Sequence, residues 1–219
     1  MRIENRFTAI ALALAATLPM AAQAGQNGVV FTQVGVTGIG IGYAQSVAPD
    51  FAIRGQVSAL PNVSGTGPVK FGSLGDTGQV NANLTWSAVQ IVADWYPSKG
   101  NGFRVSGGLV INNSKLALDG TGKVGPQNVN INGEVKVSDG VAPYLGIGYS
   151  TRPKDAKGWG FMVDAGVAFQ KPTASLTIPD PAQAALLEAD RVKQLADMQD
   201  AINPLKAMPM LSIGVSYAF

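Results

Sequence analysis

The sequence contains no cysteine and no histidine among its 219 residues. Without cysteine there is no disulfide framework and no thiolate that could bind a metal or attack a substrate. Without histidine the commonest general base and transition-metal ligand is missing, together with every Ser–His or Cys–His catalytic arrangement. We therefore expect a protein that is not an enzyme, with no metal site and no cofactor.

Charge is also scarce. Only 14% of the residues are charged, against about 25% in an ordinary soluble domain. The formal net charge is +2, so the chain lacks the basic surface that binds nucleic acid. Glycine, in contrast, is abundant, with 27 residues.

The sequence has a single long apolar run, and it lies at the N-terminus. Arg2 and Arg6 precede an apolar segment over 7–22, and Ala22-Gln23-Ala24 closes it. A basic start, an apolar centre and a small-x-small ending are typical of a secretory signal peptide. A membrane anchor is the alternative, but the run is short for a span of about 20 residues. We predict a cleaved signal peptide over 1–24 and a mature, exported chain over 25–219.

The mature chain is dominated by alternation of apolar and polar residues, the pattern of β-strands. One face of each segment is apolar, as with Phe51, Ile53 and Val57, and the other is polar or very small. Small inward residues suit the lumen of a narrow barrel whose outer face meets lipid. The predicted strands are 29–46, 50–60, 80–97, 102–117, 127–150, 158–174 and 208–219.

The connections alternate between short and long along the chain. "SVAPD", "YPSKGNG" and "TRPKDAKG" are short, whereas 61–79, 118–139 and 175–207 are long. Short periplasmic turns and longer extracellular loops are typical of outer-membrane barrels. We therefore predict an all-β fold, a closed antiparallel transmembrane β-barrel. A soluble secreted β-sandwich is the alternative fold.

Aromatic residues gather beside the short turns and the C-terminus. Folded as antiparallel hairpins, they form one interfacial girdle at the periplasmic end. The predicted girdle residues are Tyr43, Phe51, Trp95, Phe103, Tyr149, Trp159, Tyr217 and Phe219.

Four charged residues fall on inward-facing strand positions and form a predicted lumen charge network: Arg54, Asp94, Arg104 and Asp164. An isolated buried charge is costly, so such residues need one another. We expect Asp94 to lie opposite Arg104, and we expect Gly42 and Gly146 to make room for Arg54 and Asp164. The network is interpreted as an ion-pair plug. A gate for a small solute and a catalytic carboxylate pair are the alternatives.

One long connection carries a predicted amphipathic helix, about 181–203. Asp180 can cap it, Pro181 suits its first position, and Pro204 ends it. The helix is expected to lie on the barrel rim. A lid or plug over the lumen, or a surface for a partner or for lipopolysaccharide, is the alternative.

Three stretches resemble a known family: the "AQA" signal ending, "VADWYPSKGNGFRVSGGLVINN", and the C-terminal "LSIGVSYAF". Together they are similar to the small Gram-negative outer-membrane β-barrels of the OmpW/OmpA-like superfamily. The resemblance implies a bacterial outer-membrane location and recognition of Phe219 by the barrel assembly machinery. Such barrels have an even number of strands, so we expect eight. The eighth is either a short strand within 25–36 or a division of 127–150.

The function that follows is an envelope-structural role or passage of small, apolar solutes. The alternative is a surface-recognition or adhesion barrel that binds a ligand through its extracellular loops. A lipid-modifying barrel enzyme would usually rely on histidine, which this chain lacks. Outer-membrane lipid and lipopolysaccharide are the expected partners, without nucleic acid.

The signal-peptide prediction has a direct test. The protein recovered from the outer membrane of an expressing Gram-negative cell should begin at Gly25, because the cleavage site follows Ala24. Intact-mass spectrometry measures this. A mass that retains 1–24 would instead identify an uncleaved anchor.

Overall fold

The computed structural model describes residues 28–71, 76–98, 101–124, 127–138, 140–151, 157–181, 184 and 188–219. The predicted signal peptide and its cleavage site lie outside these residues. Within the described ranges, no helix combines the length and the apolar character needed to cross a membrane.

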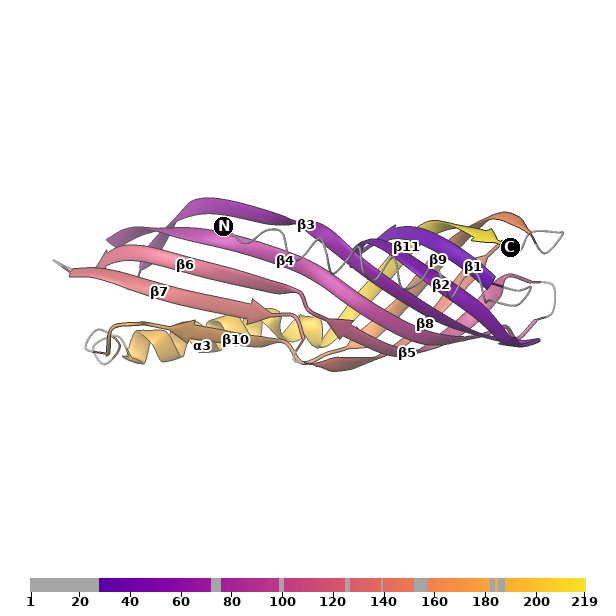
Figure 1. Ribbon diagram of the computed structural model, residues 1–219. Coiled ribbons are helices and arrows are strands. Elements are labelled where there is room, and N and C mark those ends of the chain that lie inside the picture. Colours follow the sequence, from indigo (N-terminus) through magenta and orange to yellow (C-terminus); the bar gives the residue numbers. More distant parts are fainter. Residues whose placement is uncertain are drawn as a thin grey trace.

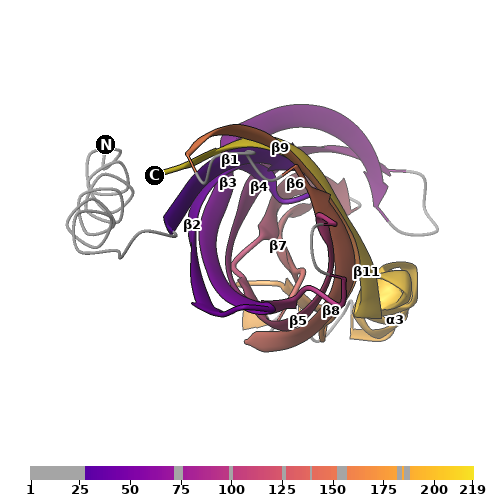
Figure 2. The ribbon, with the colours of Figure 1, turned by 90° about the vertical axis from the view of Figure 1, so that its right-hand side faces the viewer.

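Eight antiparallel strands form a closed barrel (Figure 2). Around the barrel they are β1 (Gly28–Gly35), β2 (Gly38–Ala48), β3 (Phe51–Phe71), β4 (Asp76–Trp95), β5 (Phe103–Asn112), β8 (Val141–Ser150), β9 (Gly158–Phe169) and β11 (Ala207–Ala218). The last strand pairs with the first, from Val29 opposite Ala218 to Gly35 opposite Ser212. This pairing removes the free edges that an open sheet would leave, and it confirms the predicted eight-stranded barrel.

The predicted strand 29–46 is two strands. β1 and β2 are joined by a turn at Val36 and Thr37, and Gly38 follows with a φ of 100°. A positive φ favours glycine, so this residue allows the reversal. The sequence concealed the turn because apolar alternation continues on both sides of it.

Five strands form an extension beyond one end of the barrel (Figure 1). β3 and β4, of 21 and 20 residues, continue past the barrel wall. β6 (Lys115–Val124), β7 (Gln127–Lys136) and β10 (Thr173–Thr177) are added beside β4 in that order. The prediction of long loops over 61–79 and 118–139 is therefore wrong, and so is the single strand over 127–150, which divides into β7 and β8.

Two other predicted strands also prove to be two strands each. The predicted strand 102–117 divides into β5 and β6, and 158–174 divides into β9 and β10. The extended hairpins are rich in Gly and Asn, which are poor strand formers on their own. They are strands here because each pairs along its whole length with a neighbour.

Helix α3 (Glu188–Ile202) covers one edge of the extension. β10 is the last strand of the sheet, and Gln199 donates to the Pro172 carbonyl at 3.2 Å and accepts from the Ala174 N–H at 3.3 Å. Arg191 donates to the Leu176 carbonyl at 3.4 Å. These side chains satisfy strand groups that would otherwise be open to pairing.

The helix lies outside the ring of barrel strands (Figure 2) and runs beside β10 of the extension (Figure 1). The Ala184 N–H donates to the Asp180 carbonyl at 2.8 Å, so helical bonding begins near the predicted start. α3 ends at Ile202 and a 3-10 turn, η1 (Asn203–Lys206), contains Pro204. On the surface of α3, hydrogen bonds from Arg191 lower the pKa of Glu188.

The opposite edge of the extension is open. β2 pairs with β3 only as far as Ile39 opposite Ala59. Among the described strands, β4 alone pairs with the part of β3 beyond Leu60. Pro61 and Pro68 lie in this part, and proline is typical of edge strands because it lacks a donor.

The two faces of β4 exchange polarity near Ser87. In the barrel, its outward residues are apolar: Val89, Ile91, Ala93 and Trp95. In the extension, the outward residues are polar: Gln79, Asn81, Asn83 and Thr85. The inward residues change in the opposite sense and are apolar in the extension: Val80, Ala82, Leu84 and Trp86. An outer face that is apolar over the barrel and polar beyond it marks the limit of a hydrocarbon layer.

This limit predicts a large difference between two equivalent substitutions on one strand. Ile91→Arg should cost about 2–4 kcal/mol of unfolding free energy in lipid vesicles, since it places a charge on the apolar belt. Asn83→Arg, on the same face of the extension, should cost less than about 0.5 kcal/mol. Urea unfolding of both variants measures the difference, and equal costs would contradict the boundary near Ser87.

Candidate functional site

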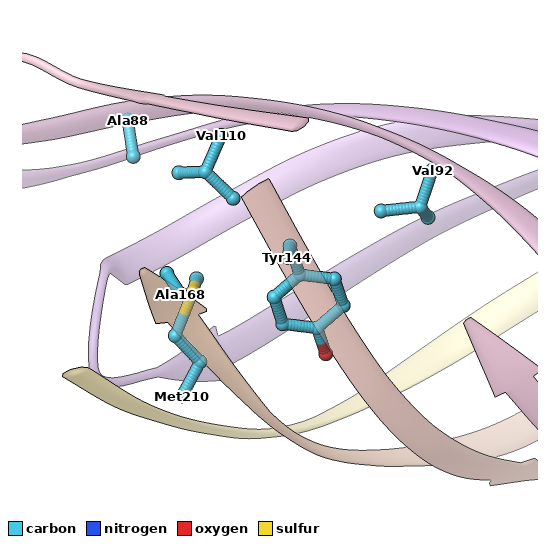
Figure 3. Packing of buried hydrophobic residues seen from close by; sticks show 6 residues of the cluster. All are labelled: Ala88, Val92, Val110, Tyr144, Ala168 and Met210. Carbon is cyan, nitrogen blue, oxygen red and sulfur yellow. The ribbon is translucent and has the colours of Figure 1, made fainter. Parts of the chain in front are cut away.

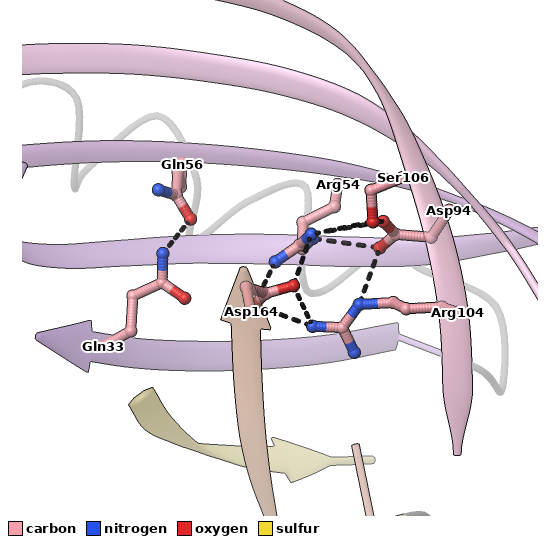
Figure 4. Close-up of polar contacts among 7 residues, drawn as sticks. All are labelled: Gln33, Arg54, Gln56, Asp94, Arg104, Ser106 and Asp164. Carbon is pink, nitrogen blue, oxygen red and sulfur yellow. Dashed lines mark hydrogen bonds and ion pairs between the residues drawn. The ribbon is translucent and has the colours of Figure 1, made fainter. Parts of the chain in front are cut away.

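The centre of the barrel holds a buried ion cluster, formed by Arg54, Asp94, Arg104 and Asp164 (Figure 4). The four residues come from β3, β4, β5 and β9, and each is at most 5% exposed. The structure thus brings together all four residues of the predicted lumen charge network.

Asp164 bridges the two arginines. Arg104 Nη2 lies 2.7 and 2.8 Å from its two carboxylate oxygens. Arg54 Nη1 and Nη2 donate to the same carboxylate at 2.9 and 3.2 Å. Charge-assisted bonds of this length are among the stronger ones in proteins, so the side chain of Asp164 fixes the positions of both guanidinium groups.

Asp94 pairs with the same two arginines from the other side. Arg54 Nη2 donates to Asp94 Oδ1 at 3.2 Å, and Arg54 Nε lies 2.9 Å from Oδ2 without the alignment of a hydrogen bond. Arg104 Nε lies 3.8 Å from the same Oδ2. Ser106 donates its hydroxyl to Asp94 Oδ1. The charges of two cations and two anions therefore cancel within the lumen.

The predicted partners across the strands are wrong by two positions. Asp94 lies opposite Ser106 rather than Arg104, Arg54 lies opposite Ala44 rather than Gly42, and Asp164 lies opposite Gly148 rather than Gly146. Each predicted turn centre lies one residue too early in the chain, and this moves the register between the two strands by one inward position.

Gly148 supplies the space that the cluster needs. A Cβ at this position would lie 2.5 Å from Asp164 Oδ1 and 2.9 Å from Arg104 Nε. Gly148 lies opposite both residues, one on each neighbouring strand. The ring of Phe31 lies on another side of the cluster, with Arg54 Cζ 5.9 Å from its centroid, within range of a cation–π contact.

An apolar layer fills the lumen between the ion cluster and the extension (Figure 3). Its members are Ala88, Val92, Val110, Tyr144, Ala168 and Met210. The Tyr144 ring lies over Gly146 and Gly166, where any Cβ would collide with it. On the extension side of this layer, the Asn112 side chain donates to the Gln170 side chain at 3.2 Å. The barrel is therefore filled across its middle, as expected for eight strands.

Two cavities adjoin the ion cluster, and they differ greatly in size. The pocket toward the extension, lined by Gln33, Gln56 and Tyr144 among others, measures about 10 Å³. The cavity on the other side, here called the vestibule, measures about 260 Å³ and is lined by Arg54, Asp94 and Arg104 at its inner end. It lies at the end of the barrel that carries the short turns and the C-terminus, here called the turn end.

The predicted girdle residues lie at this turn end. Phe51 is opposite Trp95, and Phe103 is opposite Tyr149. Trp159 and Tyr217 are opposite one another and their rings meet edge to face, with centroids 5.3 Å apart. Tyr43 pairs with Val30 and Gly55 a little higher on the wall, and the Phe219 N–H donates to the Gly28 carbonyl at 3.2 Å.

The sequence reasoning expected small inward residues at Ser106 and Gly148, but it missed two large residues that complete the lumen, Phe31 and Tyr144. Each lies at an inward position of a strand whose other inward residues are polar or small, as predicted. Their parity along the strand was a usable signal, but the partners of each depend on the register between strands. Within the described residues, no group of His, Cys, Asp and Glu could hold a metal ion.

A closed eight-stranded barrel with an apolar outer belt and a filled lumen has the fold of a small outer-membrane β-barrel protein. Two solved Acinetobacter baumannii structures share it. CarO2 matches with a TM-score of 0.56 at 19% identity, over 88% of this chain and 97% of that one. CarO matches with a TM-score of 0.53 at 20% identity, over the same shares. At this identity the likeness concerns the fold.

No family model matches the sequence. No curated protein matches it either.

The ion cluster predicts a severe effect from loss of its bridging carboxylate. Asp164→Ala should lower the free energy of unfolding by about 3–5 kcal/mol, because it leaves two buried guanidinium groups short of a partner. Urea unfolding in detergent or vesicles measures the loss. Ser212→Ala, at the position opposite Asp164 on β11, is the matched control and should cost less than about 1 kcal/mol. Similar costs for the two variants would show that the cluster does not hold the lumen together.

Proposed function

We propose that the protein is a non-enzymatic, integral outer-membrane barrel with an envelope-structural role. The barrel acts as a sealed anchor, and the extension presents a polar face to the saccharides of surrounding lipopolysaccharide. The turn end faces the periplasm and the extension lies outside the cell. The exchange of polarity on β4 near Ser87 is the observation that supports this proposal most directly.

The outward face of the extension is polar on all five strands. Its exposed residues include Thr66, Gln79, Asn81, Asn83, Asp119, Thr121, Asn130, Asn132, Ser175 and Thr177. These side chains align across the sheet: Asn81 is opposite Asp119, which is opposite Asn132, which is opposite Thr177. Amides and hydroxyls offer both donors and acceptors, which suits a hydroxyl-rich ligand.

The position of this face supports lipopolysaccharide as its proposed neighbour. It continues the lipid-facing side of the barrel wall beyond the level at which the apolar belt ends. In a lipopolysaccharide leaflet, the acyl chains would contact the belt and the sugars would lie directly above them. The face therefore begins at the depth at which sugars replace acyl chains.

The filled lumen argues against a wide conduit. The ion cluster and the apolar layer cross it, and the pocket between them measures about 10 Å³. Placement in the OmpW/OmpA-like superfamily and capture of Phe219 by the assembly machinery belong to the proposal, whereas passage of small apolar solutes is a competing function. Recognition of another ligand by the same polar face is the alternative.

Lipopolysaccharide should stabilise the refolded protein more than lipid A does, because lipid A lacks the core sugars. The triple variant Asn81→Ala, Asn83→Ala, Asn132→Ala should lose most of the difference in melting temperature between the two lipids. Asn101→Ala, at the turn end, is the control and should retain it. Circular dichroism melting in detergent with each lipid measures the effect. Equal stabilisation by both lipids would contradict a saccharide-binding face.

Planar-bilayer recording tests the sealed lumen. The wild-type protein should give no steady conductance steps, whereas Tyr144→Ala, which removes the largest side chain of the apolar layer, should give small ones. Heat-dependent gel mobility confirms that both variants are folded barrels. Steady conductance by the wild-type protein would favour the passage of solutes over a structural role.

A further inference from the structure

The vestibule is a cavity at the turn end, far from the polar face of the extension. Its volume of about 260 Å³ is large enough for a small organic molecule. The pocket on the other side of the ion cluster has room for about one water. A molecule that enters from the turn end would therefore stop at the cluster.

The ion cluster is asymmetric when seen from the vestibule. Arg54, Arg104 and Asp94 line the vestibule, whereas Asp164 lines the small pocket on the opposite side together with Arg54. The described part of the vestibule wall thus carries two cations and one anion. Although the cluster is neutral as a whole, its vestibule side favours an anionic ligand.

Arg104 lines the vestibule and has donors that make no hydrogen bond within the cluster. Its side chain is 2% exposed, and Nη2 donates to both oxygens of Asp164. Within the described residues Nε makes no hydrogen bond, and in Figure 4 no contact joins Nη1 to the other residues of the cluster. Buried guanidinium donors normally have hydrogen-bond acceptors. An acceptor from outside the cluster would complete the hydrogen bonding of Arg104.

The side walls of the vestibule are of two kinds. Val29, Phe31, Ala52 and Met162 supply apolar surface, and Ser150, Thr151 and Ser216 carry hydroxyl groups. An apolar wall beside a cationic end is the arrangement that binds a small amphiphilic anion.

We infer that the vestibule binds a small organic carboxylate that enters from the turn end. Its carboxylate accepts hydrogen bonds from Arg104, and its apolar or aromatic body packs against Phe31 and Met162. This site is independent of the proposed saccharide-binding face, since the two lie at opposite ends of the molecule.

Benzoate and its uncharged isostere benzamide test the inference. Both are titrated into the refolded, full-length mature protein in a detergent that carries no carboxylate, and binding is measured by saturation-transfer NMR. Benzoate should bind at least about tenfold more tightly than benzamide, the difference expected for a charge-assisted hydrogen bond. Equal affinity for benzoate and benzamide would overturn a carboxylate site.

Two variants locate the site. Ser150→Leu fills the vestibule without touching the ion cluster and should weaken benzoate binding at least about tenfold through lost volume. Ser64→Leu, the same change at an exposed position of the extension, is the control and should bind normally. Arg104→Lys, which keeps the charge paired with Asp164, should reduce the preference for benzoate over benzamide. Unchanged benzoate binding by a folded, heat-modifiable Ser150→Leu barrel would place the ligand elsewhere and overturn the inference.

Discussion

The carboxylate of Asp164 between two arginines is the interaction on which the interior of the barrel depends. An eight-stranded barrel has little interior volume, and here four charged residues share its centre. None of them is stable there alone, because a buried charge without a partner is costly. The requirement that they meet fixes the register of β3, β4, β5 and β9 relative to one another. It also divides the lumen into a sealed upper part and an open vestibule below.

The strands face three environments: lipid around the barrel, the lumen inside it, and the polar surroundings of the extension. Each strand position is suited to one of them. Outward residues of the barrel are apolar where lipid would lie and polar where the extension leaves it. Inward residues change in the opposite sense, from the ion cluster to the apolar inner face of the extension. A bulge between Leu60 and Val63 on β3 accompanies this change. It adjusts the alternation on β3 so that Val63 again faces inward, opposite Leu84.

The barrel could be predicted from the sequence because alternation with period two is a local property. It located the strands around Phe51, Ile91 and Ile213, and it identified the four lumen charges from their parity alone. The pairing of those charges could not be predicted, because register depends on turn geometry that alternation does not encode. The extension was missed for a related reason. Stretches such as 61–68, which contains two prolines and two glycines, are weak strand formers, and only their neighbours make them strands.

The two edges of the extension differ, and this has a consequence for self-association. α3 occupies the edge at β10, through Gln199 and Arg191, whereas the edge at β3 beyond Leu60 pairs with no described strand on its outer side. Sheets polymerise edge to edge only when both edges are available. A copy of this protein that joined another through β3 would present only helix-covered edges to a third. Growth by strand addition would therefore end at a two-fold symmetric pair.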